Sequence, residues 1–210
     1  MKNKKSAVIL LSGGLDSYVS LDIAKSKYEI SLAITFDYGQ VALREEIEAS
    51  GKIAKQYGIK HKIIKLPFLS EMCPNTLKDI WIPNRNGLFL NIAGCFCDKY
   101  GYDGIIFGAN MEEAQEFIDN SMNFIKNAQK ALSYSTRNNP KIVAPLIKMT
   151  KYETILYGIE KNLDFSLIKS CYDSKISSGK KHCSKCPSCK LLKNALKKAQ
   201  REDLIEKMGF

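Results

Sequence analysis

The chain has 210 residues, 45% of them hydrophobic and 26% charged, with a formal net charge of +10. This length allows one large domain with a real core, and we expect a small appendage besides. The apolar run after the basic N-terminal residues is too short for a signal peptide, and no run approaches the roughly 18 apolar residues of a membrane span. Secreted disulfide scaffolds are usually shorter than this chain. We therefore expect a cytoplasmic protein with reduced cysteines.

The positive charge is concentrated near the C-terminal end. Residues 1–168 hold 21 Lys/Arg and 18 Asp/Glu, whereas residues 169–201 hold ten Lys/Arg and a single acidic residue. Such a basic segment can attract polyanions, nucleotides or RNA. A solvated lysine-rich face explains the same composition, so charge alone leaves both interpretations open.

Apolar patterning predicts strands that alternate with helices. In chain order we expect a strand at 7–11, a helix at 16–25, a strand at 30–36, a helix at 42–57, a strand at 61–66, a buried helix at 88–100, a strand at 104–107, a helix at about 112–132, a strand at 141–144, a helix at 150–161 and a helix near 191–200. This alternation is typical of a doubly wound, Rossmann-like α/β fold with a five-stranded parallel sheet. The apolar periodicity ends near Ser170, so we divide the chain into an α/β domain at 1–168 and a C-terminal module at 169–210.

The run Ser-Gly-Gly-Leu-Asp-Ser at 12–17 follows the first predicted strand. In doubly wound sheets, ligands bind where a strand turns into the next helix. Gly13 and Gly14 have no Cβ, so backbone N–H groups can approach an anion closely, and Ser12 and Ser17 add hydroxyl groups at a helix N-terminus. We expect a phosphate cradle, although a plain Gly-Gly turn with a helix cap is the ordinary alternative.

This cradle matches neither the Walker loop nor the dinucleotide-binding loop. It resembles instead the PP-loop of the ATP pyrophosphatases, which hold the pyrophosphate that leaves when a substrate oxygen receives AMP. The resemblance implies that ATP binds at Ser12, Gly13, Gly14, Leu15, Asp16 and Ser17.

Four cysteines near the end of the chain have metal-ligand spacing. Cys183, Cys186 and Cys189 form a C-x-x-C-x-x-C run, and Cys171 precedes it by twelve residues. Four thiolates around one ion form a closed structural zinc site. An iron–sulfur cluster and disulfides are the alternatives, and we expect Zn²⁺ from the spacing and the reducing setting. His182 adjoins the run, and we expect it to be a neighbour of the site because four cysteines complete the ligand set.

The other cysteines are Cys73, Cys95 and Cys97. We expect packed thiols, because Cys95 and Cys97 both fall within the apolar helix predicted at 88–100.

Four stretches together resemble the QueC family of 7-cyano-7-deazaguanine synthases. These are SGGLDS at 12–17, DYGQ at 37–40, IPNRN at 82–86, and MTK at 149–151 followed by SCY at 170–172 and the cysteine run. Their order and spacing agree from end to end. The resemblance implies a fold like that of the adenine nucleotide α hydrolases, also called the HUP class.

The resemblance also implies a reaction. The family converts 7-carboxy-7-deazaguanine and ammonia to 7-cyano-7-deazaguanine, using ATP to adenylate first the carboxylate and then the amide. Such chemistry needs Mg²⁺ and a pocket closed to water. It further implies small-molecule partners, no nucleic acid, no membrane, and by analogy a homodimer.

Residue roles follow from the same resemblance. Asp16, Lys151 and Arg85 are the expected catalytic residues. The rest of the nucleotide pocket is expected at Asp37, Tyr38, Gln40 and Asn86.

Two departures from the family pattern affect the expected substrate pocket. After DYGQ the family usually has Arg-His, and this chain has Val41 and Ala42. Where the family typically has Tyr-Pro-Asp-Cys-Arg, this chain keeps Asp119 but has Asn120 and Ser121 in place of the Cys-Arg pair. A related enzyme acting on a different carboxylate is therefore an alternative.

Two further alternatives come from other functional classes. A tRNA-modifying, adenylating sulfurtransferase would need a persulfide-carrying cysteine near the ATP site, and the burial expected for Cys95 and Cys97 disfavours it. A non-enzymatic interaction module on an inactive nucleotide fold is disfavoured by the intact loop at 12–17.

Overall fold

A computed structural model of the protein describes residues 4–73, 81–173 and 181–210. Its centre is a sheet of five strands in the order β3-β2-β1-β4-β5, with every neighbouring pair parallel. The strands are β1 (Lys5–Leu10), β2 (Tyr28–Asp37), β3 (Lys60–Lys65), β4 (Gly104–Ile106) and β5 (Lys141–Val143). The predicted doubly wound, five-stranded parallel sheet is confirmed.

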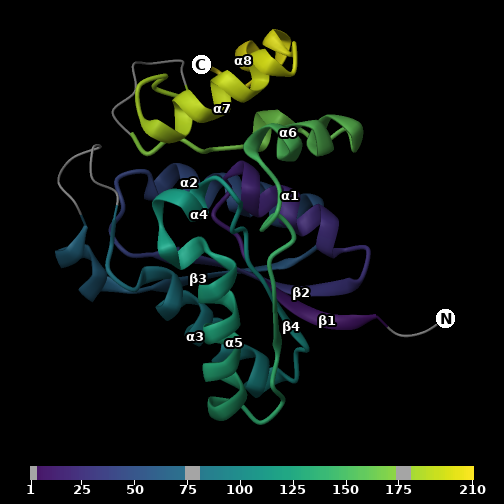
Figure 1. Ribbon diagram of the computed structural model, residues 1–210, viewed down its shortest axis with the longest axis vertical. Coiled ribbons are helices and arrows are strands. Elements are labelled where there is room, and N and C mark those ends of the chain that lie inside the picture. Colours follow the sequence, from purple (N-terminus) through teal and green to yellow (C-terminus); the bar gives the residue numbers. More distant parts are fainter. Residues whose placement is uncertain (1–3, 74–80, 174–180) are drawn as a thin grey trace.

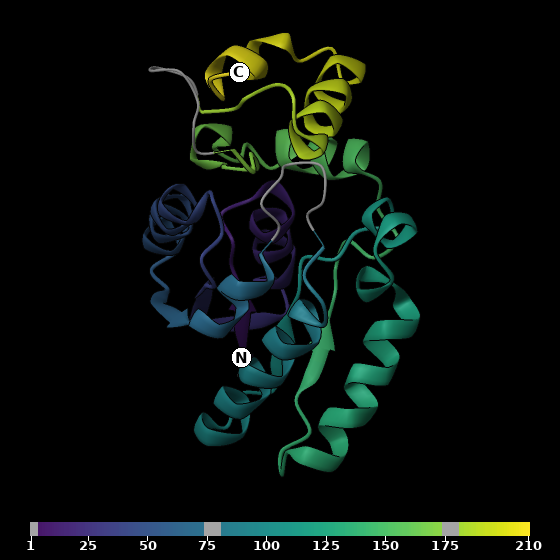
Figure 2. The same cartoon turned by 90° about the vertical axis from the view of Figure 1, so that its left-hand side faces the viewer.

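Helices cover both faces of the sheet (Figures 1 and 2). One face carries α1 (Leu15–Ala24), α2 (Leu43–Gln56) and α6 (Lys151–Glu160), and the other carries α3 (Arg85–Tyr100) and α5 (Met122–Ser135). Successive side chains of a strand point to opposite faces. Ala7 and Ile9 of β1 accordingly pack under the first group of helices, whereas Val8 and Leu10 pack under the second. The continuous apolar run of the sequence is therefore a strand buried on both sides.

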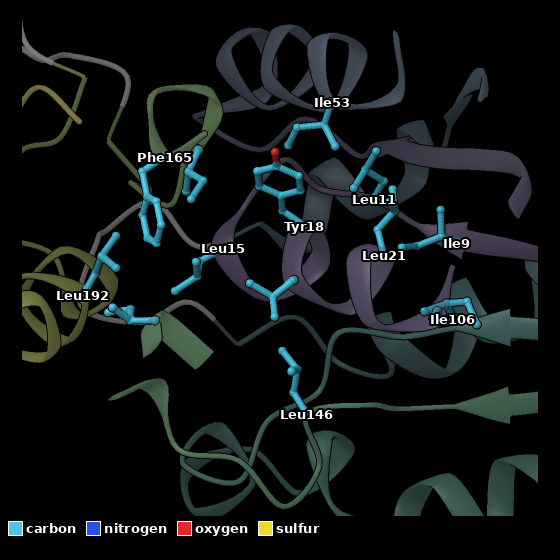
Figure 3. Packing of buried hydrophobic residues seen from close by; sticks show 14 of the residues in the cluster. Ile9, Leu11, Leu15, Tyr18, Leu21, Ile53, Ile106, Leu146, Phe165 and Leu192 are labelled. Atoms are coloured by element: carbon cyan, nitrogen blue, oxygen red, sulfur yellow. The ribbon is translucent and has the colours of Figure 1, made fainter. Parts of the chain in front are cut away.

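The C-terminal helix α7 (Pro187–Lys198) packs against α6, and α8 (Glu202–Lys207) packs against α7, in yellow at the top of Figure 1. Leu192 of α7 belongs to the same buried cluster as Leu15 and Tyr18 of α1, and Figure 3 shows these side chains near Phe165. Phe165 begins the short 3-10 helix η3 (Phe165–Leu167), which links α6 to the C-terminal segment. The C-terminal helices thus share the hydrophobic core of one sheet face.

Most predicted elements occur where the patterning placed them. Each strand matches its prediction to within two residues at either end, and the helices predicted at 16–25, 42–57 and 150–161 are α1, α2 and α6. The capping box at the start of α6 is present: Thr150 accepts a hydrogen bond from the backbone of Glu153, whose side chain accepts one from the Thr150 backbone. The loop after β3 contains the 3-10 helix η1 (Pro67–Met72).

The single helix predicted at 112–132 is wrong. The segment consists of α4 (Glu113–Glu116), the 3-10 turn η2 (Ile118–Asn120) and α5, which begins at Met122. Phe117 is extended, with φ −126° and ψ 109°, which ends α4. Ser121 then caps α5 by accepting a hydrogen bond from the Phe124 N–H at 3.1 Å. The patterning missed this new helix start because apolar periodicity alone does not reveal a serine cap.

The last predicted helix also differs from the structure. It begins at Pro187 rather than near Leu191, because Cys186 is its N-cap and proline suits the first helical position. It ends at Lys198, and α8 follows as a separate helix.

The apolar helix predicted at 88–100 is buried on one face only. It begins at Arg85, and Leu90, Ala93 and Cys97 form its buried face. Cys95 is exposed, so its expected burial is wrong. Two residues along a helix correspond to about 200°, which turns Cys95 away from the face that buries Cys97.

No helix within residues 4–73, 81–173 and 181–210 combines the length and the apolar character that crossing a membrane requires.

We expect Leu192→Ala to lower the free energy of unfolding by about 2–5 kcal/mol, because it opens a cavity in a fully buried site. Leu192 is 1% exposed and packs in the cluster that includes Leu15. The measurement is urea unfolding followed by circular dichroism. Leu156→Ala is the matched control, since Leu156 is 40% exposed. If Leu192→Ala instead showed a separate unfolding transition at low urea, with the main transition unchanged, the C-terminal helices would not share the core.

Candidate active site and metal centre

The loop at 12–17 lies where the winding of the sheet reverses. β1 is hydrogen-bonded to β2 on one side and to β4 on the other. The chain leaves β1 into α1 on one face and leaves β4 toward α5 on the opposite face, which opens a crevice beyond the carboxyl ends of these strands. The predicted position of the loop is therefore correct.

Gly13 fits this loop for two reasons. Its φ of +83° lies in the left-handed region that favours glycine. A Cβ there would lie 2.7 Å from the Cβ of Ala49 and 2.9 Å from the backbone nitrogen of Ser50, so α2 leaves no room for a side chain. The glycine allows the loop to press against the second helix.

Serine oxygens accept from the backbone amides of the loop. The Gly14 N–H donates to Ser12 Oγ at 3.3 Å, and the Leu15 N–H donates to Ser170 Oγ at 3.2 Å. These amides stand at the N-terminus of α1, where anionic oxygens are favoured. The Leu15 side chain is 2% exposed and lies in the core, so only its backbone faces the loop.

A buried ion pair joins the loop to α6. Lys151 Nζ lies 2.5 Å from Asp16 Oδ2 and 3.6 Å from Glu113 Oε1. Burial acts to lower the pKa of Lys151, but the negative charges of Asp16 and Glu113 outweigh it and raise that pKa. Burial, together with the nearby Asp16 charge, raises the pKa of Glu113. The cation is therefore held charged at the entrance to the phosphate loop.

Two adjoining cavities meet at this point. The narrower, of about 210 Å³, lies over the loop, and the wider, of about 580 Å³, extends toward α4 and α7. Among the described residues, the same eight side chains border both cavities: Tyr38, Glu46, Arg85, Glu113, Asn120, Lys151, Tyr172 and Ser188. One ligand over the loop can therefore contact a second ligand in the wider cavity.

Arg85 and Tyr38 form the wall between the cavities. The guanidinium Nη1 donates to Tyr38 Oη at 3.4 Å, and the guanidinium carbon lies 5.7 Å from the ring centroid. Burial raises the pKa of Tyr38 to about 12, so the phenol keeps its proton. Burial acts to lower the pKa of Arg85, but the surrounding acidic groups, Tyr38 first, raise it. Arg85 thus stays cationic at the junction of the two cavities.

Of the other residues expected in the nucleotide pocket, two border a cavity and one does not. Asn86 borders the narrow cavity and donates to the backbone carbonyl of Asp119 at 3.5 Å. Gln40 borders the wide cavity. Asp37 borders neither cavity, and its Oδ1 accepts from the Gly39 N–H at 3.4 Å. The structure thus gives Asp37 a place in the turn after β2.

Aromatic and acidic side chains line the wide cavity. The rings of Trp81 and Phe117 are nearly parallel, at 7°, with centroids 6.0 Å apart. Asp119 is 7% exposed, and burial raises its pKa although Arg85 offsets part of the shift. Flat aromatic faces beside a buried carboxyl group suit a planar heterocycle that carries hydrogen-bond donors.

The departures from the family pattern fall partly in this cavity. Val41, Ala42 and Asn120 border it. Ser121 is not among the described residues that border either cavity, and it caps α5 instead.

Sequence reasoning gave no role to three residues that border the cavities: Glu46 and Tyr172 border both, and Ser170 borders the narrow one. Glu46 lies in the first turn of α2, and Ser170 and Tyr172 flank Cys171. The SCY stretch at 170–172 was a signal for the latter two, because a serine and a tyrosine beside a metal ligand have fixed positions. Nothing local distinguishes Glu46 from its neighbour Glu45.

The four cysteines form one cluster. The Sγ atoms of Cys171, Cys183, Cys186 and Cys189 all lie within 4.8 Å of one another. Backbone N–H groups donate to these sulfurs: that of Cys186 to Cys183 Sγ at 3.3 Å, and that of Cys189 to Cys186 Sγ at 3.4 Å. Such bonds favour thiolates, the form that binds metal. The four sulfurs therefore fit a tetrahedral, all-thiolate metal site.

His182 does not belong to this cluster within the described part of the chain. Its Nδ1 lies 3.0 Å from the carbonyl oxygen of Met208, and its Nε2 lies 3.4 Å from the backbone nitrogen of Ser170. A neutral ring that donates from Nδ1 and accepts at Nε2 satisfies both contacts. Burial lowers the pKa of His182 to about 4, which agrees with a neutral ring. The histidine therefore connects the cluster region to the segment beside the phosphate loop.

Solved structures share the fold. The U34-tRNA thiolase NcsA of Methanococcus maripaludis, described with its 4Fe-4S cluster, matches 99% of this chain and 70% of its own with a TM-score of 0.55 and 20% identity. The NH3-dependent NAD synthetase of Campylobacter jejuni matches 99% of this chain and 85% of its own with a TM-score of 0.52 and 17% identity. At these identities, the likeness concerns the fold alone.

Closer relatives share the sequence. The 7-cyano-7-deazaguanine synthase of Methanosarcina barkeri is 38% identical over 233 residues, covering 97% of this chain and 99% of the relative. That of Bdellovibrio bacteriovorus is 38% identical over 225 residues, covering 95% and 96%. The family model described as "Queuosine biosynthesis protein QueC" matches residues 6–200. With the glycine loop at 12–17, the paired cavities and the four-cysteine cluster all in place, this chain belongs to the QueC family.

Proposed function

We propose that this chain is a ligase that makes 7-cyano-7-deazaguanine from 7-carboxy-7-deazaguanine and ammonia, with ATP cleaved to AMP and pyrophosphate. The observation that carries the proposal is the shared wall of the two cavities. A nucleotide over the loop and a carboxylate in the wide cavity would meet at Arg85 and Lys151, which border both. Two fixed cations at that point stabilise the charge that develops at the transferred phosphorus.

ATP would occupy the narrow cavity. Its phosphate oxygens would accept from the loop amides and from the hydroxyls of Ser12 and Ser17, and Lys151 would neutralise the departing pyrophosphate. Ser17 Oγ already donates to the Gly14 carbonyl at 3.0 Å, and Ser12 Oγ donates to Ser17 Oγ at 3.2 Å. The loop is thus held in shape by bonds among its own residues.

The deazapurine would occupy the wide cavity. Its flat ring suits the faces of Trp81 and Phe117, and its N1–H and 2-amino group suit a buried carboxylate, which Asp119 supplies. The carboxylate of the substrate would then point toward Arg85 and the α-phosphate. Because ATP would fill the narrow cavity of about 210 Å³, the ring system of the substrate would bind in the wide one.

Mg²⁺ fits beside the phosphate loop. Asp16 Oδ1 is buried and has no hydrogen-bond partner among the described atoms, and the carboxyl group of Glu113 lies across Lys151 from it. Carboxylate oxygens together with ATP phosphates are the ligands that Mg²⁺ uses in such sites. When bound, the ion would spread the negative charge of the phosphates. Asp16 and Glu113 are the residues that would hold it.

Zn²⁺ is the metal we assign to the cysteine cluster. Four sulfur donors within one small sphere match structural zinc, and the cluster lies in the wall of the site rather than in a cavity. Its role would be to fix the segment that carries Ser170 and Tyr172. An iron–sulfur cluster is the other occupant that these ligands accept.

The remaining features of the setting follow from the chemistry. The substrates are small molecules, and a metal site made of four cysteines needs reduced thiols, so we place the enzyme in the cytoplasm. By analogy with related folds, we propose that the enzyme is a homodimer. We also propose that it does not bind nucleic acid.

The sulfurtransferase alternative is weaker in the structure. Cys73 borders the wide cavity, and its Sγ donates to the Tyr38 carbonyl at 3.4 Å. Burial raises the pKa of Cys73, whereas persulfide chemistry requires an accessible thiolate. Of the other two candidates, Cys97 is buried and Cys95 borders neither cavity.

The first prediction concerns the reaction. Protein incubated with ATP, Mg²⁺, ammonium and 7-carboxy-7-deazaguanine should give amide and then nitrile in mass spectra, with release of AMP. Asp16→Ala should abolish AMP release, because the phosphate loop loses its carboxylate and Lys151 loses the closer of its two anionic partners. Cys73→Ser should keep the activity. Circular dichroism checks that both variants fold, and carboxylate-independent AMP release by the unchanged protein would contradict the proposal.

The second prediction concerns the heterocycle. We expect the protein to prefer 7-carboxy-7-deazaguanine over its analogue without the 2-amino group by roughly 10²-fold or more in kcat/KM, since a buried carboxylate would be left unpaired. Asp119→Asn should reduce this preference. Glu116→Gln is the control, because Glu116 borders the same cavity but is exposed. Undiminished preference in Asp119→Asn would exclude Asp119 as the group that binds the 2-amino edge.

The third prediction concerns the metal. Cys186→Ser should lose bound zinc, measured by inductively coupled plasma mass spectrometry, and should unfold at lower urea concentration, because metal binding contributes to folding. Cys95→Ser should change neither quantity, since Cys95 is exposed and outside the cluster. Iron in place of zinc, or a metal-replete Cys186→Ser of unchanged stability, would overturn the assignment.

A further inference from the structure

The proposed reaction must remove protons from nitrogen, and the side chains that border both cavities limit what can accept them. Among the described residues, two carboxylates border both cavities, Glu46 and Glu113. Glu113 lies 3.6 Å from Lys151 Nζ in an ion pair. Glu46 forms no ion pair within the described part of the chain, and its hydrogen-bonded neighbour is the neutral Gln40. Glu46 is therefore the carboxylate there that is not committed to a cation.

Gln40 fixes the position of this carboxylate. Its Nε2 donates to Glu46 Oε2 at 2.8 Å and to the Phe36 carbonyl at 3.0 Å. Its Oε1 accepts from the Tyr38 N–H at 3.0 Å. All three contacts agree with one orientation of the amide, so the glutamine is held by the end of β2 and in turn holds one oxygen of Glu46. No described residue donates a hydrogen bond to the other oxygen, Oε1, which leaves it for a ligand at the junction.

The charged surroundings of Glu46 come from three elements. Arg85 of α3 and Lys169, which follows η3, act to lower its pKa, whereas Glu45 on the same helix acts to raise it. The fourth titratable neighbour, Tyr38, keeps its proton. Burial exceeds all of these effects and raises the pKa of Glu46 to about 7. A carboxyl group of this kind exchanges protons readily near neutral pH.

We propose that Glu46 is a catalytic residue of the nitrogen chemistry, the general base that takes the proton from ammonia as the amide forms and from the amide nitrogen as the nitrile forms. This inference rests on the proposed function. It assigns proton transfer to a residue at the junction, a role that the residues proposed to bind the phosphates and the heterocycle do not fill.

Both steps balance with one proton acceptor. In the first, the lone pair of ammonia forms the C–N bond, the bond from carbon to the AMP oxygen breaks, AMP leaves with that electron pair, and one N–H proton passes to Glu46. In the second, the amide oxygen already carries AMP, and the nitrogen has released the first of its two protons to water, which leaves a neutral imidate. The remaining N–H proton passes to Glu46, the electrons of that bond complete the C≡N bond, and AMP leaves with the former amide oxygen and the electron pair of the C–O bond. Glu46 returns its proton to water between the steps.

The test separates adenylation from nitrogen chemistry. Carboxylate-dependent exchange of labelled pyrophosphate into ATP, measured without ammonium, reports adenylation alone. Nitrile formation at a fixed NH3 concentration reports the complete reaction. For Glu46→Gln we expect exchange within about threefold of the unchanged protein and nitrile formation lower by about 10²–10⁴-fold, the usual contribution of a general base. Glu48→Gln is the matched control, because Glu48 lies on the same helix with its side chain 59% exposed.

A pH profile supplies an independent readout. At constant NH3, the rate of nitrile formation by the unchanged protein should rise as pH increases through about 7, and Glu46→Gln should lack this rise.

The pH dependence of folding stability provides a second measurement of the same carboxyl group. The pKa is raised from 4.5 to about 7 on folding, so the folded state binds more protons in that window and stability falls as pH rises through it. In Glu46→Gln, the free energy of unfolding measured with urea should therefore decrease less as pH rises through this range.

Each outcome of these experiments either supports or contradicts the proposed role of Glu46. Loss of nitrile formation with exchange kept supports the inference. Nitrile formation near the level of the unchanged protein overturns it, and so does loss of exchange in a folded Glu46→Gln, because the residue would then act in adenylation. No exchange by the unchanged protein would refute the proposed function itself, which is a different result.

Discussion

The site depends on how residues 169–172 dock against the phosphate loop. The Lys169 N–H donates to the Gly13 carbonyl at 2.9 Å, and Ser170 Oγ accepts from the Leu15 N–H. The next residue, Cys171, belongs to the four-sulfur cluster, and Tyr172 borders both cavities. A loop at one end of the chain is thus supported by a segment 155 residues away. Because η3 precedes this segment and the cluster follows it, both ends of the segment are anchored, and a metal in the cluster would contribute to the shape of the phosphate site without contacting a substrate.

The buried charges beside the loop make sense as part of a binding site. Lys151 is 6% exposed, and removing a cation from water is costly unless well-placed anions compensate. Asp16 and Glu113 supply that compensation, and the start of α6 is held by the bond from the Lys151 N–H to Glu112 Oε2 at 3.1 Å. A hydrophobic replacement of such a group would often be as stable. The arrangement therefore favours a fixed position for the cation over folding stability, and that position is at the junction of the two cavities.

The sequence predicted the parts of the molecule that depend on local patterns. The strands and the glycine loop at 12–17 follow from spacing within a few residues. The run of Cys183, Cys186 and Cys189 does so too, whereas Cys171 lies twelve residues before it. The missed features depend on distant contacts or on caps: the division of residues 112–132 follows from the Ser121 cap, and the exposure of Cys95 follows from which side of α3 faces the sheet. Glu46 was missed partly for the same reason: Gln40 is only six residues away along the chain, but Arg85 and the two cavities come near Glu46 only after α2 and α3 pack on opposite faces of the sheet.

The DYGQ stretch illustrates how a short motif divides its tasks once folded. Its aspartate accepts from the Gly39 N–H within the turn, and Gly39, at φ +80°, lies so close to Ser70 that a Cβ would meet the serine Cβ at 2.7 Å. Its tyrosine stacks against Arg85 in the wall, and its glutamine holds Glu46. Two of the four residues therefore shape the backbone, and two place side chains at the junction. Val41 and Ala42, which depart from the family pattern, follow this motif directly and border the wide cavity, so the departures change the lining of that cavity and leave the Gln40–Glu46 contact of this chain intact.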